Sequence, residues 1–311
     1  LAAPTGKAAK RISEATGIPA VTLHRLLEFT HPGDPDEKTG KAIGVSEPRR
    51  NRNNRLDYNV ILVDEASMIN QQLFRDLMDA IPNGGVVRLF GDVNQLPPIE
   101  ERDDYKKLPS PFTKMMAEFP SVKLTNIYRQ GEGSGIVKNA HRILQGWVPQ
   151  NMDDFVLTIG KPHLPNVVLD IAKTSGVDFN SLDNQIITPT NRGWIGQVQL
   201  NIALQKQRWG DELFRAPLMP RSKWDKQELS VLEGDKVIWR KNDYNLNIYN
   251  GETGIIKSLA GDCVAVDFGD RVVDVPPWIS YTDPKTGDIK GYDPRVNLYL
   301  AYALTTHACQ G

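Results

Sequence analysis

Cysteine is scarce in this chain: only Cys263 and Cys309 occur among 311 residues, far apart and without CxxC spacing. This scarcity excludes a structural zinc site of the usual spacing and indicates a reducing compartment. No apolar run approaches the roughly 18 residues of a membrane span, and no signal peptide begins the chain. We therefore expect a cytosolic protein without membrane contact.

An excess of charge is also missing, because the formal net charge is -1. Any nucleic-acid site must therefore be a local patch, since the chain as a whole has no attraction for polyanions. The phosphate loop GxxxxGK[ST] is absent as well. Gly6-Lys7 lacks the earlier glycine, and Ala8 stands where a hydroxyl is required. The chain begins without Met and ends at Gly311 after a motif-like stretch, so we expect a piece of a longer protein.

An ordinary globular composition is present, with 40% apolar and 24% charged residues and enough length for two domains. Within it, the run 60–63 (VILV) leads directly into Asp64 and Glu65. We expect a buried strand of a parallel sheet, with both carboxylates at its carboxyl end. One acid suits Mg²⁺, usually through water, and the other suits polarising an attacking water. The alternative is a plain strand followed by an acidic turn.

A second strand is predicted at 86–90, ending in the polar stretch 91–98 (GDVNQLPP). Two strand ends that place polar groups at one sheet edge are hard to explain by folding alone, and they indicate a functional site. Near the start, residues 1–5 run into a helix that begins at Gly6 and stops at Gly17. Its N-terminus beside Thr5 can hold a nucleic-acid phosphate through backbone N–H groups, although a plain strand-to-helix turn is the alternative.

The segment 28–57 interrupts this pattern with proline, glycine and the basic run 49–55, and it predicts an inserted hairpin or functional loop. It follows a short helix capped by Thr22 and carrying His24, a residue that on its own is more typical of packing. The arginines of the basic run are either solvated or in contact with phosphates.

Further elements follow from periodicity and turn residues. We expect helices at 71–81, 112–119, from 135 with Ile136 and Ile143 inward, and at 194–209, with strands at 122–124 and 185–191. A domain boundary is predicted near 146–152. Short strands at 235–239, 254–257, 263–268 and 271–275 predict a small inserted β-barrel, and 298–304 returns to buried-sheet character.

In order along the chain, these stretches resemble the motifs of RecD-like superfamily 1 DNA helicases. This is the 5′-to-3′ branch that includes the small Dda-type phage helicases. The matching segments are 1–11 (motif Ia), 63–68 (motif II), 91–98 (motif III), 124–130 (motif IV) and 306–311 (motif V). Motifs II, III and IV at these spacings are specific together, and the resemblance covers almost the whole chain.

The resemblance implies an α/β fold of two RecA-like parallel-sheet domains, 1–147 and 148–311. The first is incomplete because it lacks the phosphate loop. It also implies a duplex-splitting pin within 28–57 and an SH3-like β-barrel at about 221–290. The expected activity is ATP-driven 5′-to-3′ unwinding of DNA. The expected partners are single-stranded DNA, the duplex junction and replication or recombination proteins, in the cytoplasm of a bacterial or phage-infected cell.

The same resemblance assigns roles at the nucleotide, with ATP and Mg²⁺ as cofactors. Asp64 holds Mg²⁺, Glu65 activates water, Gln95 senses the γ-phosphate and Arg129 acts as an arginine finger, while Gly311 joins the nucleotide contacts. Contacts to the single strand are implied for six residues: Pro4, Thr5, His24, Asn191, Thr306 and His307.

The chain departs from the family in motif V, where Ala308-Cys309 replaces Lys-Ser and removes one phosphate contact. The phosphate loop is expected before Leu1, and motif VI is expected after Gly311. The main alternative is a non-catalytic single-strand binding module derived from a helicase. Another is a different P-loop ATPase such as a clamp loader, a class that lacks both the barrel insertion and the Thr-His-x-x-Gln-Gly ending.

Overall fold

The computed structural model divides by its contacts into two compact units, which we describe separately. Unit 1 comprises Leu1–Pro4 and Ala15–Lys161, and unit 2 comprises Thr5–Glu14 and Pro162–Gly311. The predicted limit of the first RecA-like domain at residue 147 stays a prediction. The structure describes every residue except 31–45, 101, 129, 132, 159–166, 168–169, 172–173, 216–229, 244, 283–286 and 311.

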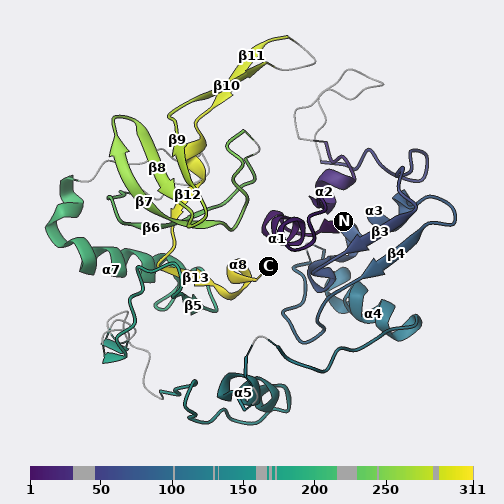
Figure 1. Ribbon diagram of the computed structural model, residues 1–311, viewed down its shortest axis with the longest axis horizontal. Coiled ribbons are helices and arrows are strands. Elements are labelled where there is room, and N and C mark those ends of the chain that lie inside the picture. The colour runs from purple at the N-terminus through teal and green to yellow at the C-terminus, as the bar shows by residue number, and fades with distance from the viewer. Residues whose placement is uncertain are drawn as a thin grey trace. The chain divides into compact units, whose positions relative to one another are not determined.

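Unit 1 is built on a parallel sheet with the strand order β2-β1-β3-β4. Its strands are β1 (Ala2–Ala3), β2 (Val21–Thr22), β3 (Val60–Val63) and β4 (Val86–Leu89). β3 and β4 run side by side, with Val63 opposite Leu89 (Figure 1). The predicted parallel α/β arrangement of these two strands is confirmed.

Helices in unit 1 are α2 (Leu23–Leu26), α3 (Gln71–Ala80), α4 (Pro111–Glu118) and α5 (Gly135–Leu144), with 3₁₀ turns at Ala66–Met68 and Tyr105–Lys107. α3 begins where the side chain of Asn70 accepts a hydrogen bond from the backbone N–H of Leu73. Its Leu73–Leu77 face packs into a core with Ile61 and Val63 of β3. Burial of this apolar stripe stabilises the helix on the sheet.

Two expectations for unit 1 are wrong. Residues 121–128 contain no strand, and Val122 and Leu124 are each 88% exposed. A strand needs a neighbour for its backbone groups, and no described strand lies beside this segment. Helix α5 forms as predicted, but it buries Gly135 and Asn139 and exposes Ile136 and Ile143. The cause is local, because the segment that follows the helix folds back onto its Asn139 face. The Asn139 amide donates a hydrogen bond to the carbonyl of Gln150 and accepts one from its N–H.

Unit 2 has a second parallel pair, β5 (Ile186–Thr188) and β13 (Ala303–Thr305), followed by α8 (Thr306–Cys309). Helix α7 (Gln197–Trp209) packs on β13, and the 3₁₀ helix Gly210–Arg215 follows it. Asn201 of α7 exchanges hydrogen bonds of 2.9 and 2.8 Å with the backbone of Ala303. Helix α1 (Gly6–Thr16) belongs to unit 2 by its contacts over Thr5–Glu14.

An antiparallel sheet is inserted in unit 2, with the order β12-β6-β7-β8-β9. Its strands are β6 (Lys236–Trp239), β7 (Thr253–Ala260), β8 (Cys263–Asp267), β9 (Val272–Val275) and β12 (Leu298–Leu300). A hairpin of β10 (Ile279–Thr282) and β11 (Ile289–Tyr292) and the 3₁₀ turn Pro294–Asn297 precede β12. The predicted strands are confirmed, while closure into an SH3-like barrel stays a prediction.

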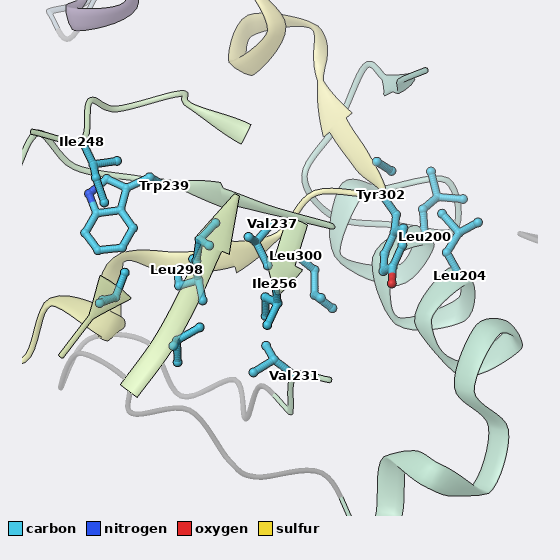
Figure 2. Packing of buried hydrophobic residues seen from close by; sticks show 14 residues of the cluster. Leu200, Leu204, Val231, Val237, Trp239, Ile248, Ile256, Leu298, Leu300 and Tyr302 are labelled. Carbon is cyan, nitrogen blue, oxygen red and sulfur yellow. The ribbon is translucent and has the colours of Figure 1, made fainter. Parts of the chain in front are cut away.

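The core of unit 2 joins the inserted sheet to helix α7 (Figure 2). Trp239 and Tyr302 are its largest buried side chains, and Leu200 and Leu204 of α7 lie beside Tyr302. Beneath them Asp235 is fully buried and accepts four hydrogen bonds: from Leu232 N–H (2.8 Å), Gln205 Nε2 (2.6 Å), Trp209 Nε1 (2.6 Å) and Tyr302 Oη (2.5 Å). Its donors come from α7, from the chain beside β13 and from the turn before β6.

Lys236 is another fully buried charged residue of unit 2, at 0% exposure. Its Nζ donates to the carbonyl of Ser181 at 2.8 Å and to the carbonyl of Asn184. Desolvation lowers the pKa of Lys236 to about 8, although the charges of Asp178, Asp183 and Cys309 oppose this shift. The folded protein therefore gives up this proton more readily than the unfolded chain.

A pH dependence of stability follows from Lys236. Between about pH 8 and 10.5 the unfolded chain keeps a proton that the folded chain loses, so the free energy of unfolding rises with pH. The gain is on the order of 3 kcal/mol across that window. Urea unfolding at stepped pH should show this rise, and Lys236→Met should remove it. An equal rise in the Lys236→Met variant would assign it to other groups.

Candidate nucleotide and nucleic-acid site

The carboxyl ends of three strands of unit 1 lie at one edge of its sheet, and those of β3 and β4 are the two that the sequence predicts there. Pro4 follows β1, Asp64 follows β3 and Gly91 follows β4 after Phe90. Two backbone hydrogen bonds fix the edge: the N–H of Asp64 donates to Ala2 (3.0 Å), and that of Phe90 donates to Val63 (2.8 Å). Open α/β sheets bind ligands at this kind of edge.

Glu65 has an unusual backbone, with φ 50° and ψ 36° in the left-handed region. For a residue other than glycine or asparagine this conformation costs roughly 1 kcal/mol and is most often kept at functional sites. The neighbouring bonds hold it there: Glu65 N–H donates to Asp64 Oδ1 (2.9 Å) and Ala66 N–H donates to Phe90 O (2.7 Å). Residue identity alone gave no signal of this conformation.

Gly91 begins the turn after β4 and packs against the turn after β3. A Cβ atom at Gly91 would lie 2.9 Å from the backbone nitrogen of Ser67 and 3.2 Å from the ring of Phe112. Glycine is therefore required for the two strand-end turns to approach each other. Further along, Asp92 Oδ1 accepts a bond from Asn94 N–H (2.9 Å), and Gln95 N–H donates to Asp92 O (3.2 Å). These bonds hold the turn that presents Gln95.

The half-buried carboxylate of Asp64 fits a hard divalent cation such as Mg²⁺. One of its oxygens is engaged by the Glu65 N–H, and the other is available for a water of the ion's shell. No cluster of three or more His, Cys, Asp or Glu side chains suited to a metal occurs among the residues described. Asp64 is therefore the carboxylate at this edge that could hold Mg²⁺, an ion that usually keeps several water ligands and also binds substrate phosphates.

Arg129 and Gly311, predicted at the nucleotide, lie outside the described residues. Their placement stays a prediction. The segment just before Arg129 is exposed, with Ile127 at 47% and Tyr128 at 89%.

Two predicted single-strand contacts belong to unit 1. Pro4 is partly exposed after β1, and His24 is exposed on α2, whose N-cap Thr22 accepts a bond from Arg25 N–H (3.2 Å). The His24 ring lies 4.8 Å from that of Phe29, centroid to centroid. Desolvation lowers the pKa of His24, against the charge of Asp76.

The other four predicted contacts belong to unit 2. Thr5 Oγ1 caps α1 by accepting a bond from Ala8 N–H (3.2 Å). Asn191 follows β5, while Thr306 and His307 begin α8 directly after β13, and all three are exposed. Because β5 and β13 are parallel, these three residues share one sheet edge. The structure therefore places Asn191, Thr306 and His307 at one sheet edge of unit 2, and their contact with single-stranded DNA stays a prediction.

The basic run 49–55 is largely engaged in the fold of unit 1. Arg50 pairs with Glu28 (2.9 Å) and Asp57 (3.0 Å), and Arg52 pairs with Asp79 (2.9 Å). Arg55 donates to the carbonyl of Ile81. An antiparallel bridge between Phe29 and Pro48 closes the base of the insertion, whose residues 31–45 lie outside the described part. These arginines brace the insertion, which accounts for them without phosphate contacts.

Comparison with known proteins adds independent evidence. An AAA domain family model matches residues 1–101. The chain is 31% identical over 321 aligned residues to the ATP-dependent RecD2 DNA helicase of Deinococcus radiodurans, covering 100% of this chain and 37% of that protein. It is 28% identical over 291 residues to the RecBCD enzyme subunit RecD of Mycolicibacterium smegmatis, covering 82% and 48%. The chain thus spans half or less of these curated relatives.

The fold matches a solved structure of Bacteroides Pif1 helicase in complex with ADP-AlF3 and ssDNA. The TM-score is 0.53 and the identity 20%, over 99% of this chain and 72% of that one. In the described part of the chain, no helix is long and apolar enough to cross a membrane. The motifs, the strand-end geometry and these likenesses agree, and over its whole length the chain is similar to RecD-like DNA helicases.

Proposed function

We propose that this chain forms the central part of an ATP-driven 5′-to-3′ DNA helicase that translocates on single-stranded DNA. The observation that carries the proposal is the sheet edge of unit 1. There Asp64, the left-handed Glu65 and the turn that presents Gln95 follow adjacent strands. An acid for Mg²⁺, an acid for water and an amide for the γ-phosphate are what phosphoryl transfer to water requires.

In this proposal each residue has a defined task. Glu65 accepts a proton from the attacking water, and Gln95 orients the γ-phosphate by hydrogen bonding. Arg129 spreads charge from the transferred phosphoryl group, and Gly311 contacts the nucleotide. Asp64 holds Mg²⁺, which neutralises phosphate charge when bound.

Both units are proposed to contact single-stranded DNA. Unit 1 contributes Pro4 and His24. Unit 2 contributes Thr5, Asn191, Thr306 and His307. Helix N-termini and hydroxyls suit phosphate oxygens, and His24 suits stacking. We further propose that the 28–57 insertion acts as a duplex-splitting pin at the junction. Replication or recombination proteins in the cytoplasm of a bacterial or phage-infected cell are the proposed partners.

The outer edge of β4 supports the idea that the chain works within a longer protein. β4 pairs with β3 on one side, and no described strand pairs with its other side. Val86 and Phe90 are 37% and 54% exposed there, and the apolar segment 121–128 is exposed as well. Exposed strand edges of this kind are normally covered. A strand that leads into a glycine-rich phosphate loop would complete the sheet and supply the phosphate-binding N–H groups.

The proposal is tested by measuring phosphate release with Mg²⁺, ATP and oligo-dT. Residues 1–311 alone should bind oligo-dT but show no turnover, because no GxxxxGK[ST] loop lies within them. A version joined to such a loop should turn over ATP and displace streptavidin from a 3′-biotinylated strand, but not from a 5′-biotinylated one. Turnover by 1–311 that Glu65→Gln removes would contradict the proposal. Oligo-dT binding without turnover in the longer version would favour the non-catalytic module.

A further inference from the structure

Four charged side chains of unit 2 form a closed network that the motif analysis does not use. Lys10 Nζ lies 2.9 Å from Glu252 Oε1 and 2.7 Å from Asp270 Oδ2. Arg271 meets the same two acids, at 2.8 Å from Glu252 and 2.9 Å from Asp270. Within the network two cations and two carboxylates therefore alternate, and Lys10 also lies 3.9 Å from Glu14 of its own helix.

The charged groups of this network are more buried than those of a typical surface ion pair. The side chain of Glu252 is only 9% exposed, those of Lys10 and Arg271 are 24% and 23% exposed, and only Asp270 is open at 51%. Glu252 also accepts a hydrogen bond from Tyr249 N–H (2.9 Å), and Arg271 donates to Asn247 O (2.7 Å). Anchored, partly desolvated charges interact more strongly than exposed pairs.

Close packing accompanies the network one turn earlier in helix α1. Gly6 is buried, and a Cβ atom there would lie 2.8 Å from Asn242 Oδ1 and 2.9 Å from the Tyr249 ring. The first turn of α1 thus rests on the loop before β7, and Lys10 lies one turn further along the helix. Desolvation and the neighbouring acids have opposite effects on Lys10, and the acids prevail, because its pKa is raised. Lys10 therefore stays charged in the folded state.

We infer that Lys10 is a positioning residue that fastens α1 to the inserted sheet and so holds the Thr5–Gly6 turn for single-stranded DNA. Lys10 acts through Glu252 and Asp270 and does not itself touch the strand. This inference rests on the proposed single-strand contact of Thr5. It adds a requirement that the motifs do not contain. The carboxylate of Glu252, which lies directly before strand β7 and 242 positions after Lys10, helps to hold motif Ia in place for the single strand.

The test is fluorescence anisotropy of labelled oligo-dT with residues 1–311 at several salt concentrations. Lys10→Met should weaken binding about three- to tenfold, and Lys10→Arg should restore it. The slope of log affinity against log salt should not change, because no phosphate contact is lost. A slope smaller by about 0.7 would instead mean that Lys10 touches a phosphate. Arg11→Met is the matched control, since Arg11 is the exposed next residue of α1 and takes no part in these four bonds.

Coupling to the acids is tested by a double-mutant cycle. Lys10→Met with Asp270→Asn should weaken oligo-dT binding little more than Lys10→Met alone, whereas additive losses would overturn the inference. Amide hydrogen exchange gives a readout without DNA: helix α1 should exchange faster in Lys10→Met but not in Arg11→Met. Unchanged exchange and affinity in Lys10→Met would overturn the inference and leave the proposed function standing. Failure of the unchanged chain to bind oligo-dT would overturn the proposed single-strand contact itself.

Discussion

Replacing Glu65 with glutamine is expected to lower ATP turnover by about a hundredfold or more in a version of this chain joined to a phosphate loop. Loss of a general base costs on the order of 10²- to 10⁴-fold. Nucleotide affinity should change little, because the amide keeps the size of the carboxylate and Asp64 stays in place. Single-turnover hydrolysis and binding of a fluorescent nucleotide separate the two quantities. Hydrolysis near the original rate would remove Glu65 from the mechanism.

The chain provides a matched control for this substitution. Glu28 is also a left-handed glutamate, with φ 54° against 50° for Glu65, but it lies at the base of the insertion and pairs with Arg50. Glu28→Gln changes the same chemical group at a second residue with positive φ but away from the strand-end site, so turnover should stay within about twofold of the original. A loss as large as that of Glu65→Gln would show that turnover responds to the backbone conformation of these glutamates and not to the position of Glu65.

Because the backbone of Glu65 is strained, replacing Glu65 is expected to have opposite effects on stability and on turnover. Glycine adopts the left-handed region without penalty, so Glu65→Gly should leave the free energy of unfolding unchanged or raise it by up to about 1 kcal/mol. Turnover should be lost in the same protein. A gain in stability together with a loss of activity is expected when strain is kept for function. A Glu65→Gly protein that is clearly less stable would show that the Glu65 side chain supports the turn.

The strand-end site was predictable because its signals are local. An apolar run that leads straight into Asp64 and Glu65, and a second one that leads into 91–98, identify two buried strands with polar ends. In a parallel sheet, geometry then brings both ends to one edge. The register of Val63 opposite Leu89 bears this out. The family motifs added roles to these positions but were not needed to place them.

The features that sequence did not reveal depend on distant partners or on backbone dihedrals. Lys10 reads as an ordinary basic residue on a helix, and only the fold brings Glu252 and Asp270 to it. The segment 121–128 has β-prone residues, but no strand in the described part of the chain pairs with it, so propensity alone predicted a strand wrongly. In α5 the apolar periodicity predicted that Ile136 and Ile143 face the core. The hydrogen bonds between Asn139 and Gln150 instead bury the Asn139 face of the helix. Periodicity reports amphipathicity and does not say what covers the apolar side.

Replacing Asp235 with alanine is expected to destabilise unit 2 by about 3–5 kcal/mol, because several hydrogen-bond donors lose their acceptor at once, at about 1–3 kcal/mol for each that is left buried and unpaired. Its four donors would lose this acceptor, although Gln205 Nε2 keeps the carbonyl of Ser230 at 2.8 Å. A buried donor left without a partner is costly. The carboxylate also raises the pKa of the Tyr302 hydroxyl, after burial itself, so that Tyr302 stays a donor at every accessible pH. Urea unfolding followed by the fluorescence of Trp209 and Trp239 measures the loss.

Two control substitutions test whether a loss of stability comes from the hydrogen bonds of Asp235 or from any change in the inserted sheet. Asp274→Ala removes an exposed carboxylate on β9 and should change the free energy of unfolding by less than about 0.5 kcal/mol. Tyr302→Phe removes one donor and keeps the ring in the core, so a loss of about 1–2 kcal/mol is expected. Because both partners share one bond, the losses of Asp235→Ala and Tyr302→Phe should not add in the double variant. Additive losses, or an Asp235→Ala protein as stable as Asp274→Ala, would mean that the inserted sheet and α7 are held together by the apolar core alone.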